Sequence, residues 1–271
     1  VKADGSDLRF VAGDDRPPLA FHIEKWAPAE QQALVWVDVS NLKAGAASAI
    51  YAYYGNEKAE AGQNAAGTFG VDYKLVWHFD GAGAPQDATS NGLNGVGGEA
   101  RNTGGLIGQS LTLDGAAAVS VPAEAFARGP VSVSFWVKPG SDGQLLGLSG
   151  LSLVSENATL FLDAAGQRSA GAALPAGTWA HVALVNDGQK STLFVNGQPA
   201  GEVAGALASG PAVLGQGFAG EIDEFRVVGV TLPQAAFQLA AASEGQGAKL
   251  LTFDTAEQTE SGGHNYFGIL F

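Results

Sequence analysis

Val131-Ser132-Val133-Ser134-Phe135-Trp136-Val137 is the stretch that decides the fold class. Small polar and large apolar side chains alternate along it, and this period of two is typical of a β-strand with one buried face. Further along the chain, Asn186-Asp187-Gly188 and Asn196-Gly197 separate apolar segments, as tight hairpin turns do. These features predict an antiparallel, all-β unit.

The same pattern extends to both sides of this stretch. Strands are expected in the first seventy residues at 7–11, 19–26, 33–39 and 48–54, followed by a linker rich in Ala, Gly and Asn at 58–67. A second unit opens at Leu75 and closes near Val228. Pro233 suits the first turn of one short helix near the C-terminus, and 249–253 is expected to return as a strand. The predicted domains are therefore 1–70, 71–230 and 231–271.

Composition narrows the class of partner. The chain has 271 residues and a formal net charge of −13, and it contains no cluster of basic residues, which argues against nucleic-acid binding. The absence of cysteine excludes disulfides and thiolate metal sites. No run of about 18 apolar residues exists, so the chain would meet a membrane only through segments beyond residue 271.

Seven short motifs are spread over the second unit in a characteristic order. The unit resembles the bacterial laminin-G-like branch of the concanavalin-A-like jelly rolls, and the resemblance implies a β-sandwich. The motifs are Val76-Trp77-His78-Phe79-Asp80, Asp87-Ala88-Thr89-Ser90-Asn91-Gly92, Gly108-Gln109-Ser110-Leu111, Phe135-Trp136-Val137-Lys138-Pro139, Trp179-Ala180-His181-Val182-Ala183, Leu193-Phe194-Val195-Asn196-Gly197 and Gly220-Glu221-Ile222-Asp223-Glu224-Phe225.

The first 70 residues resemble an uncharacterised bacterial domain that often precedes such a jelly roll. The resemblance lies in Ala3-Asp4-Gly5-Ser6-Asp7-Leu8-Arg9-Phe10, Trp36-Val37 and Tyr53-Tyr54-Gly55-Asn56. That domain normally begins with further strands, so the resemblance implies that the first strands of the domain are missing here.

The pairing of these two domains with the ending Ser261-Gly262-Gly263-His264-Asn265-Tyr266-Phe267-Gly268-Ile269-Leu270 resembles the periplasmic part of fused proton-channel subunits of the MotA/TolQ/ExbB family. The resemblance implies a periplasmic, non-enzymatic binding region tethered to the bacterial inner membrane. Its partner would be a protein or a cell-wall glycan, and the channel would form a homo-oligomer. The alternative is a secreted or surface carbohydrate-binding, lectin-like module.

The segment Glu221-Ile222-Asp223-Glu224-Phe225 is the sharpest enzyme candidate, because related glucanases carry catalytic carboxylates on one such strand. Strand alternation predicts that Glu221, Asp223 and Phe225 share a face and that Glu224 points away. Retaining hydrolysis needs two carboxyl groups about 5 Å apart. The position of the second one is held by Phe225, or by Arg226 if one residue is inserted, so no catalytic residue is predicted.

A calcium site is predicted from Asp80, Asp87, Asn91 and Asp223, because calcium takes carboxylate and amide oxygens. The alternative is that these side chains cap turns of their own backbone. No other cofactor is expected.

Histidines and tryptophans give weaker signals. His22, His78, His181 and His264 lack the spacing of a zinc site, and His78 and His181 are expected to be hydrogen-bonded groups inside strands. Four of the five tryptophans lie in apolar strands and are expected in the core, whereas Trp26 is expected to be the exposed one.

Overall fold

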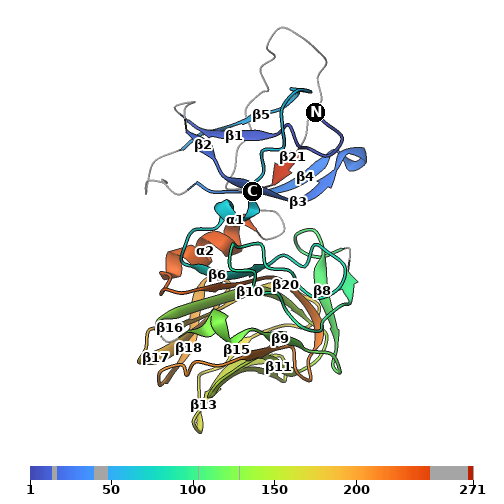
Figure 1. The fold of residues 1–271 in the computed structure, drawn as a ribbon. Helices are drawn as coiled ribbons and strands as arrows, with labels where there is room; N and C mark the ends of the chain where they lie inside the picture. The colour runs from blue at the N-terminus through green and yellow to red at the C-terminus, as the bar shows by residue number, and fades with distance from the viewer. Residues whose placement is uncertain (14–16, 40–47, 103, 128, 245–267, 271) are drawn as a thin grey trace. The chain divides into compact units, whose positions relative to one another are not determined.

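The computed structural model describes residues 1–13, 17–39, 48–102, 104–127, 129–244 and 268–270 (Figure 1). The chain divides into two compact units. The first comprises 1–70 together with 251–271, and the second comprises 71–250. The C-terminal segment therefore belongs to the same unit as the N-terminus.

The first unit contains two small sheets. One is antiparallel in the order β2 (Pro18–Leu19), β1 (Arg9–Ala12), β5 (Ile50–Tyr53). In the other, the hairpin of β3 (Phe21–Ala27) and β4 (Gln32–Val37) is joined in parallel by β21 (Gly268–Leu270). The short helices η1 (Pro28–Glu30) and α1 (Ala65–Thr68) complete the unit. Its core includes Phe10 and Phe21, whose rings meet edge to face at 5.2 Å. The four strands predicted here are confirmed.

The second unit is a sandwich of two antiparallel sheets (Figure 1). In the described residues, the first sheet has the order β18 (Gln198–Ala204), β17 (Lys190–Val195), β16 (Ala180–Asn186), β10 (Val131–Pro139), β20 (Ala219–Val228), β8 (Ser110–Asp114), β7 (Arg101–Asn102), with β6 (Tyr73–Trp77) also on β20. The second has the order β14 (Gln167–Arg168), β13 (Thr159–Ala164), β12 (Leu151–Glu156), β11 (Gly143–Leu148), β19 (Ala212–Leu214), β9 (Val119–Val121), with β15 (Ala172–Ala173) on β13. The 3-10 helix η2 (Ala123–Phe126) follows β9.

Alternation along β10 assigns its two faces as predicted. Val131, Val133, Phe135 and Val137 lie in the core between the sheets, so the side chains at 132, 134, 136 and 138 point to the outer face. The predicted hairpin turns at 186–188 and 196–197 connect β16, β17 and β18. The all-β sandwich expected from the sequence is therefore confirmed.

Strand β20 departs from simple alternation. Ser134 pairs with Arg226 but Trp136 pairs with Asp223, so two residues of β20 oppose one residue of β10. This is a β-bulge, and Glu224 within it has a φ of +52°, in the left-handed region that few non-glycine residues adopt.

Glu221 and Asp223 share the outer face as expected, since Ile222 between them lies in the core, but the expected orientations of Glu224 and Phe225 were wrong. Phe225 lies in the core, where its ring is 5.4 Å from Trp77 and 5.9 Å from Phe135. Glu224 instead shares the outer face with Arg226, to which it is ion-paired. The extra residue restores the alternation that places Val227 in the core.

The predicted helix is α2 (Gln234–Ser243), with Pro233 at its N-cap. It covers part of the outer face of the first sheet (Figure 1), where Phe237 packs against Ala183 and Phe194. No helix in the described ranges is both long and apolar enough to cross a membrane. The strand predicted at 249–253 and most of the C-terminal tail lie outside the described residues.

Candidate functional site

A row of polar side chains crosses the outer face of the first sheet at one end of β20. Glu221 of β20 is paired in register with Lys138 of β10, and Val137 is paired with Ala180 of β16. This register places Lys138 beside Trp179, and the Lys138 ammonium lies 5.9 Å from the centroid of the indole ring. The row is extended by Ser110 of β8.

Hydrogen bonds hold this row in place. Glu221 Oε1 accepts from Lys138 Nζ at 2.9 Å, while Oε2 accepts from Asn102 Nδ2 at 2.8 Å and from Ser110 Oγ at 2.9 Å. Partial burial of Glu221 opposes its ionisation, but these three side-chain donors outweigh the burial and lower the pKa of the carboxyl. Glu221 is therefore a carboxylate at neutral pH.

We call Trp179, Lys138, Glu221, Asn102 and Ser110 the Trp179 site. The side chain of Lys138 is 34% exposed and that of Glu221 is 15% exposed, and Trp179 is half-buried. An aromatic face beside an ammonium, a carboxylate and an amide offers one apolar contact and several donors and acceptors. This combination suits a polyhydroxylated ligand.

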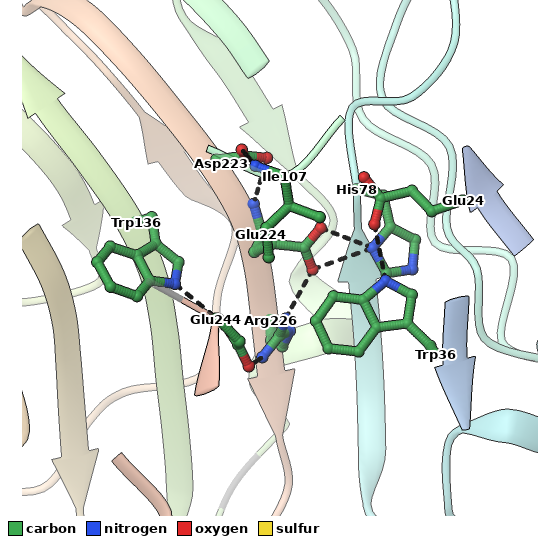
Figure 2. Close-up of polar contacts among 9 residues, drawn as sticks. All are labelled: Glu24, Trp36, His78, Ile107, Trp136, Asp223, Glu224, Arg226 and Glu244. Atoms are coloured by element: carbon green, nitrogen blue, oxygen red, sulfur yellow. Dashed lines mark hydrogen bonds and ion pairs between the residues drawn. The ribbon is translucent and has the colours of Figure 1, made fainter. Parts of the chain in front are cut away.

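A second polar cluster lies further along the outer face of the same sheet (Figure 2). Arg226 donates to Glu224 Oε2 at 2.7 Å and to Glu244 Oε1 at 2.7 Å. His78 Nδ1 lies 2.9 Å from Glu224 Oε1, and Trp136 Nε1 donates to Glu244 Oε2 at 3.1 Å. Because Glu244 is the C-cap of α2, this network fastens the end of the helix to β20 and β10.

The two neighbouring carboxyl groups of β20 have opposite pKa shifts. Burial of Glu224 opposes its ionisation, but the charges of His78 and Arg226 prevail and lower its pKa to about 2. Burial raises the pKa of Asp223 well above its ordinary value, and the negative charge of Glu224 adds to this.

Adjacent carboxyl groups with opposite pKa shifts are also found at catalytic acid–base pairs. A catalytic role would require that a substrate can reach Asp223 and Glu224. Asp223 Oδ2 accepts from the backbone N–H of Ile107 at 2.9 Å, and Oδ1 accepts from that of Glu224 at 3.0 Å. Both residues are buried, at 0% and 1% exposure. Their oxygens therefore hold backbone and ion-pair partners of the fold rather than line an open cleft.

The residues predicted to bind calcium are engaged differently. Asp87 accepts hydrogen bonds from the backbone of Val76, Thr89 and Leu93 and from the Thr89 hydroxyl, which uses most of its lone pairs. Asn91 donates to the carbonyls of Tyr73 and Lys74. These two residues thus support the turn after β6, as the turn-capping alternative expected.

The four predicted ligands are not drawn into one group. Among the described residues, the carboxylates of Asp80, Asp87 and Asp223 do not all lie within 4.8 Å of one another, and Asp80 is exposed. Calcium binding by Asp80, Asp87, Asn91 and Asp223 stays a prediction.

The expectation of hydrogen-bonded histidines inside strands is met only in part: His78 is hydrogen-bonded but lies one residue beyond β6, whereas His181 lies in β16 and its buried Nδ1 has no hydrogen-bond partner among the described residues. His78 is bonded to Glu224, and His181 is buried with its ring 5.3 Å from that of Trp136. Burial, and then the charge of Arg226, lower the pKa of His181 to about 3. Trp26 is half-buried rather than fully exposed, because its indole packs over Gly5 and donates to the Ala3 carbonyl.

Sequence reasoning missed most of the Trp179 site. Trp179 was assigned to the core, and Asn102, Ser110 and Lys138 carried no signal because each is an isolated polar residue on a different strand. Only the pairing of β7, β8, β10 and β20 brings them together. Of the members of the Trp179 site, only Glu221 was singled out from the sequence, as part of the segment 221–225.

Comparison with known families supports the two-part organisation. Residues 113–236 match the family described as the concanavalin A-like lectin/glucanases superfamily, and residues 4–90 match a domain of unknown function, DUF2341. The two matches meet the expectation of a jelly roll preceded by an uncharacterised domain. A comparison with curated proteins finds no match.

Solved structures share the fold of the sandwich. Domain 4 of AbnA, a GH43 extracellular arabinanase from Geobacillus stearothermophilus in complex with arabinotriose, aligns with a TM-score of 0.52 at 21% identity, over 63% of this chain and 98% of that domain. The binding domain of Paraclostridial Mosquitocidal Protein 1 aligns with a TM-score of 0.51 at 13% identity, over 64% of this chain and 52% of that chain. The binding domain of botulinum neurotoxin DC in complex with SialylT aligns with a TM-score of 0.51 at 12% identity, over 65% of this chain and 52% of that chain. The match thus spans only about half of each toxin domain.

Proposed function

We propose that this chain is a non-enzymatic carbohydrate-binding module and that the Trp179 site contacts the sugar. One observation carries the proposal, namely the cross-strand row in which Trp179, Lys138 and Glu221 stand side by side on a rigid sheet.

The chemistry of the row matches that of a sugar. A sugar ring has an apolar C–H face, which can stack on the half-buried indole, and hydroxyl groups at its edge that both donate and accept. Lys138 would donate to a hydroxyl oxygen, and Glu221 would accept from a hydroxyl hydrogen. The Glu221 carboxylate is oriented by Asn102 and Ser110, so little side-chain entropy would be lost on binding.

The related folds support a binding role. Two of the similar structures are complexes, one with arabinotriose and one with SialylT, and all three compared above are described as binding domains or as a domain of a glycan-degrading enzyme. At these identities the likeness concerns the fold alone. The ligand class therefore rests on the Trp179 site.

The test is isothermal titration of the full chain with a panel of hexasaccharides (arabinohexaose, cellohexaose and chitohexaose) and with a sialylated oligosaccharide. We expect Trp179→Ala to weaken the strongest interaction at least tenfold. Leu239→Ala, at an exposed apolar residue of α2, is the control and should leave it unchanged. Equal affinity of Trp179→Ala and wild type would remove the Trp179 site from the proposal.

We further propose that the module works outside the cytoplasm, as the periplasmic part of a MotA/TolQ/ExbB-like protein. The support is the order of the two domains along the chain, an uncharacterised domain at 4–90 followed by a jelly roll. Reading the gene past the codon for Phe271 tests this. Several hydrophobic spans there would agree with the proposal, whereas a stop codon or a polar linker would contradict it.

A further inference from the structure

The Trp179 site is part of a longer row of side chains that crosses the first sheet. Lys138, beside Trp179, is paired in register with Glu221, and Glu221 is paired in turn with Thr112 of β8. The strands that carry or adjoin these residues, β16, β10, β20 and β8, are successive neighbours in the sheet (Figure 1). We call Trp179, Lys138, Glu221 and Thr112 the four-strand row.

Thr112 adds a hydroxyl group at the end of this row. Its neighbours along β8, Leu111 and Leu113, lie in the core, so the side chain of Thr112 points to the outer face together with that of Glu221. Thr112 is half-buried, and its hydroxyl makes no hydrogen bond to another described residue. A hydroxyl both donates and accepts. Thr112 can therefore bond to a ligand without giving up a contact of the fold.

The spacing of the strands sets the length of the four-strand row. Neighbouring strands lie about 4.8 Å apart, so the three spacings from β16 to β8 add up to roughly 14 Å. One unit of a linear sugar chain is about as long as one spacing. The row thus has room for three successive units. The first would lie on the indole of Trp179, the second beside Lys138 and Glu221, and the third beside Thr112.

The residues that border the row favour a ligand that crosses the strands. Trp136, two residues before Lys138 on β10, is only 4% exposed, and its indole donates to Glu244 at the C-cap of α2. A sugar chain laid along β10 would meet this side chain. On the other side of the row, Gly140 and Ala219 carry no more than a methyl group. The longest continuous path for a linear chain therefore runs from β16 to β8.

We infer that the Trp179 site binds the interior of a linear oligosaccharide of three or more units, which runs across the strands from β16 to β8, and that Thr112 binds the third unit. This inference rests on the proposed function and specifies its ligand as an extended chain rather than a single terminal sugar. Each contact comes from a different strand of one sheet. A chain of fewer than three units cannot reach all of them.

A length series tests the inference on the wild-type full chain. Isothermal titration compares oligosaccharides of one to six units from the arabinan, cellulose and chitin series. In the series that binds best, we expect the affinity to rise about tenfold or more between one unit and three, because each added unit gains hydrogen bonds. Between three units and six, the affinity should rise only by the number of registers that a longer chain offers.

Thr112→Val tests the end of the row. The variant keeps the branched shape but loses the hydroxyl, so affinity for the trisaccharide should fall about threefold to tenfold, as loss of one hydrogen bond does. Affinity for the disaccharide should be unchanged. Thr192→Val is the matched control, because Thr192 also lies on the outer face of this sheet but pairs with Val185, six residues along from Trp179. It should bind as wild type does. Urea unfolding should show that both variants fold.

The outcomes separate this inference from the proposed function. If Trp179→Ala weakens binding but one unit binds as tightly as three, the inference is overturned and the Trp179 site stands. Equal affinity of Thr112→Val and wild type for the trisaccharide has the same meaning. A steep rise in affinity beyond three units would also overturn the inference, since the four-strand row is too short for it. Absence of binding to every oligosaccharide, or wild-type affinity in Trp179→Ala, would overturn the proposed function and the inference together.

Discussion

Lys138 and Glu221 face each other across β10 and β20, and their side chains form an ion pair of 2.9 Å on the outer face of the sheet. The pair is partly open to water, and a half-buried indole lies beside it. A partly exposed ion pair contributes little to folding, whereas the same two groups are suitably placed to exchange hydrogen bonds with a ligand. Binding and stability should therefore respond differently to changes at this pair.

Lys138→Met tests that difference. The substitution keeps the apolar stem but removes the charge, so we expect the free energy of unfolding to change by about 1 kcal/mol or less. Affinity for the best hexasaccharide should fall about tenfold, as loss of a hydrogen bond to a charged group does. Urea unfolding and calorimetric titration measure the two quantities. A stability loss as large as the loss in binding would assign the pair a structural role.

Arg226 and Arg168 allow a matched comparison of ion pairs. Each guanidinium binds two carboxylates, but the side chain of Arg226 is 11% exposed and that of Arg168 is 41% exposed. Arg226→Met removes the cation that Glu224 and Glu244 share in a buried place and should destabilise the protein by about 3–5 kcal/mol. Arg168→Met, the control, should cost about 0–1 kcal/mol. Similar losses from both in urea unfolding would contradict this reading of burial.

Acid stability should depend on Glu224. Its pKa falls from 4.5 to about 2 on folding, so the unfolded chain binds more protons than the folded one between these values. The stabilisation is complete above pH 4.5 and is lost as the pH falls toward 2. Glu224→Gln should therefore give a shallower decline in unfolding free energy between pH 5 and pH 3 than wild type. The slope, rather than the absolute stability, is the readout, because the variant also leaves Arg226 with one carboxylate fewer.

Asp223 should act in the opposite direction. The pKa of Asp223 is raised on folding. Its contribution to the free energy of unfolding is therefore greatest below pH 3.8 and is lost as the pH rises through the higher pKa of the folded state. Ionised Glu224 contributes to that shift. The Glu224→Gln variant should therefore also lose less stability than wild type as the pH rises above 4. A slope in this range equal to that of wild type would show that Glu224 does not influence Asp223.

The turn between β17 and β18 should be sensitive to a single methyl group. Gly197 has a φ of +73°, and a Cβ there would lie 2.7 Å from the Cα of Gln238 in α2. Gly188, in the preceding turn, has a φ of +93° but open space around it. Both alanine variants are destabilised by the positive φ. Only Gly197→Ala must also displace the helix, which should lower the free energy of unfolding by about a further 1–3 kcal/mol. Equal melting temperatures for the two variants would show that α2 can shift to accommodate the added methyl group without loss of stability.

The sequence could predict features that depend on residues close together in the chain, but not features that depend on residues far apart in it. The strand at 131–137 and the turns at 186–188 and 196–197 were correctly predicted, because they depend on alternation and on residues within a few positions of each other. The facing of Glu224 and Phe225 was not, because the bulge places a glutamate in a left-handed conformation that nothing in its immediate sequence demands. The ion pairs from Glu224 and Glu244 to Arg226 show what holds that conformation in place, and Glu244 comes from a separate element.

The Trp179 site was beyond prediction for a related reason. Its members lie on four different strands or beside them, and only the strand order fixes their neighbours. The chain segments 76–80 and 87–92 lie in the unit that forms the sandwich, and their reading as a jelly-roll signature stays a prediction, since the match to the jelly-roll family begins at residue 113. Their acidic side chains now have a local explanation, since Asp87 organises the turn that follows β6.

The division of the chain has a consequence for the order of synthesis. The first unit is made of 1–70 and 251–271, and β21 pairs in parallel with β4. A ribosome must therefore translate the whole sandwich before β21 emerges to join the first unit. The sandwich itself begins with β6 and reaches β20 as its last strand, and these two strands pair directly. The inserted unit can thus close on itself in the nascent chain before β21 is available to pair with β4.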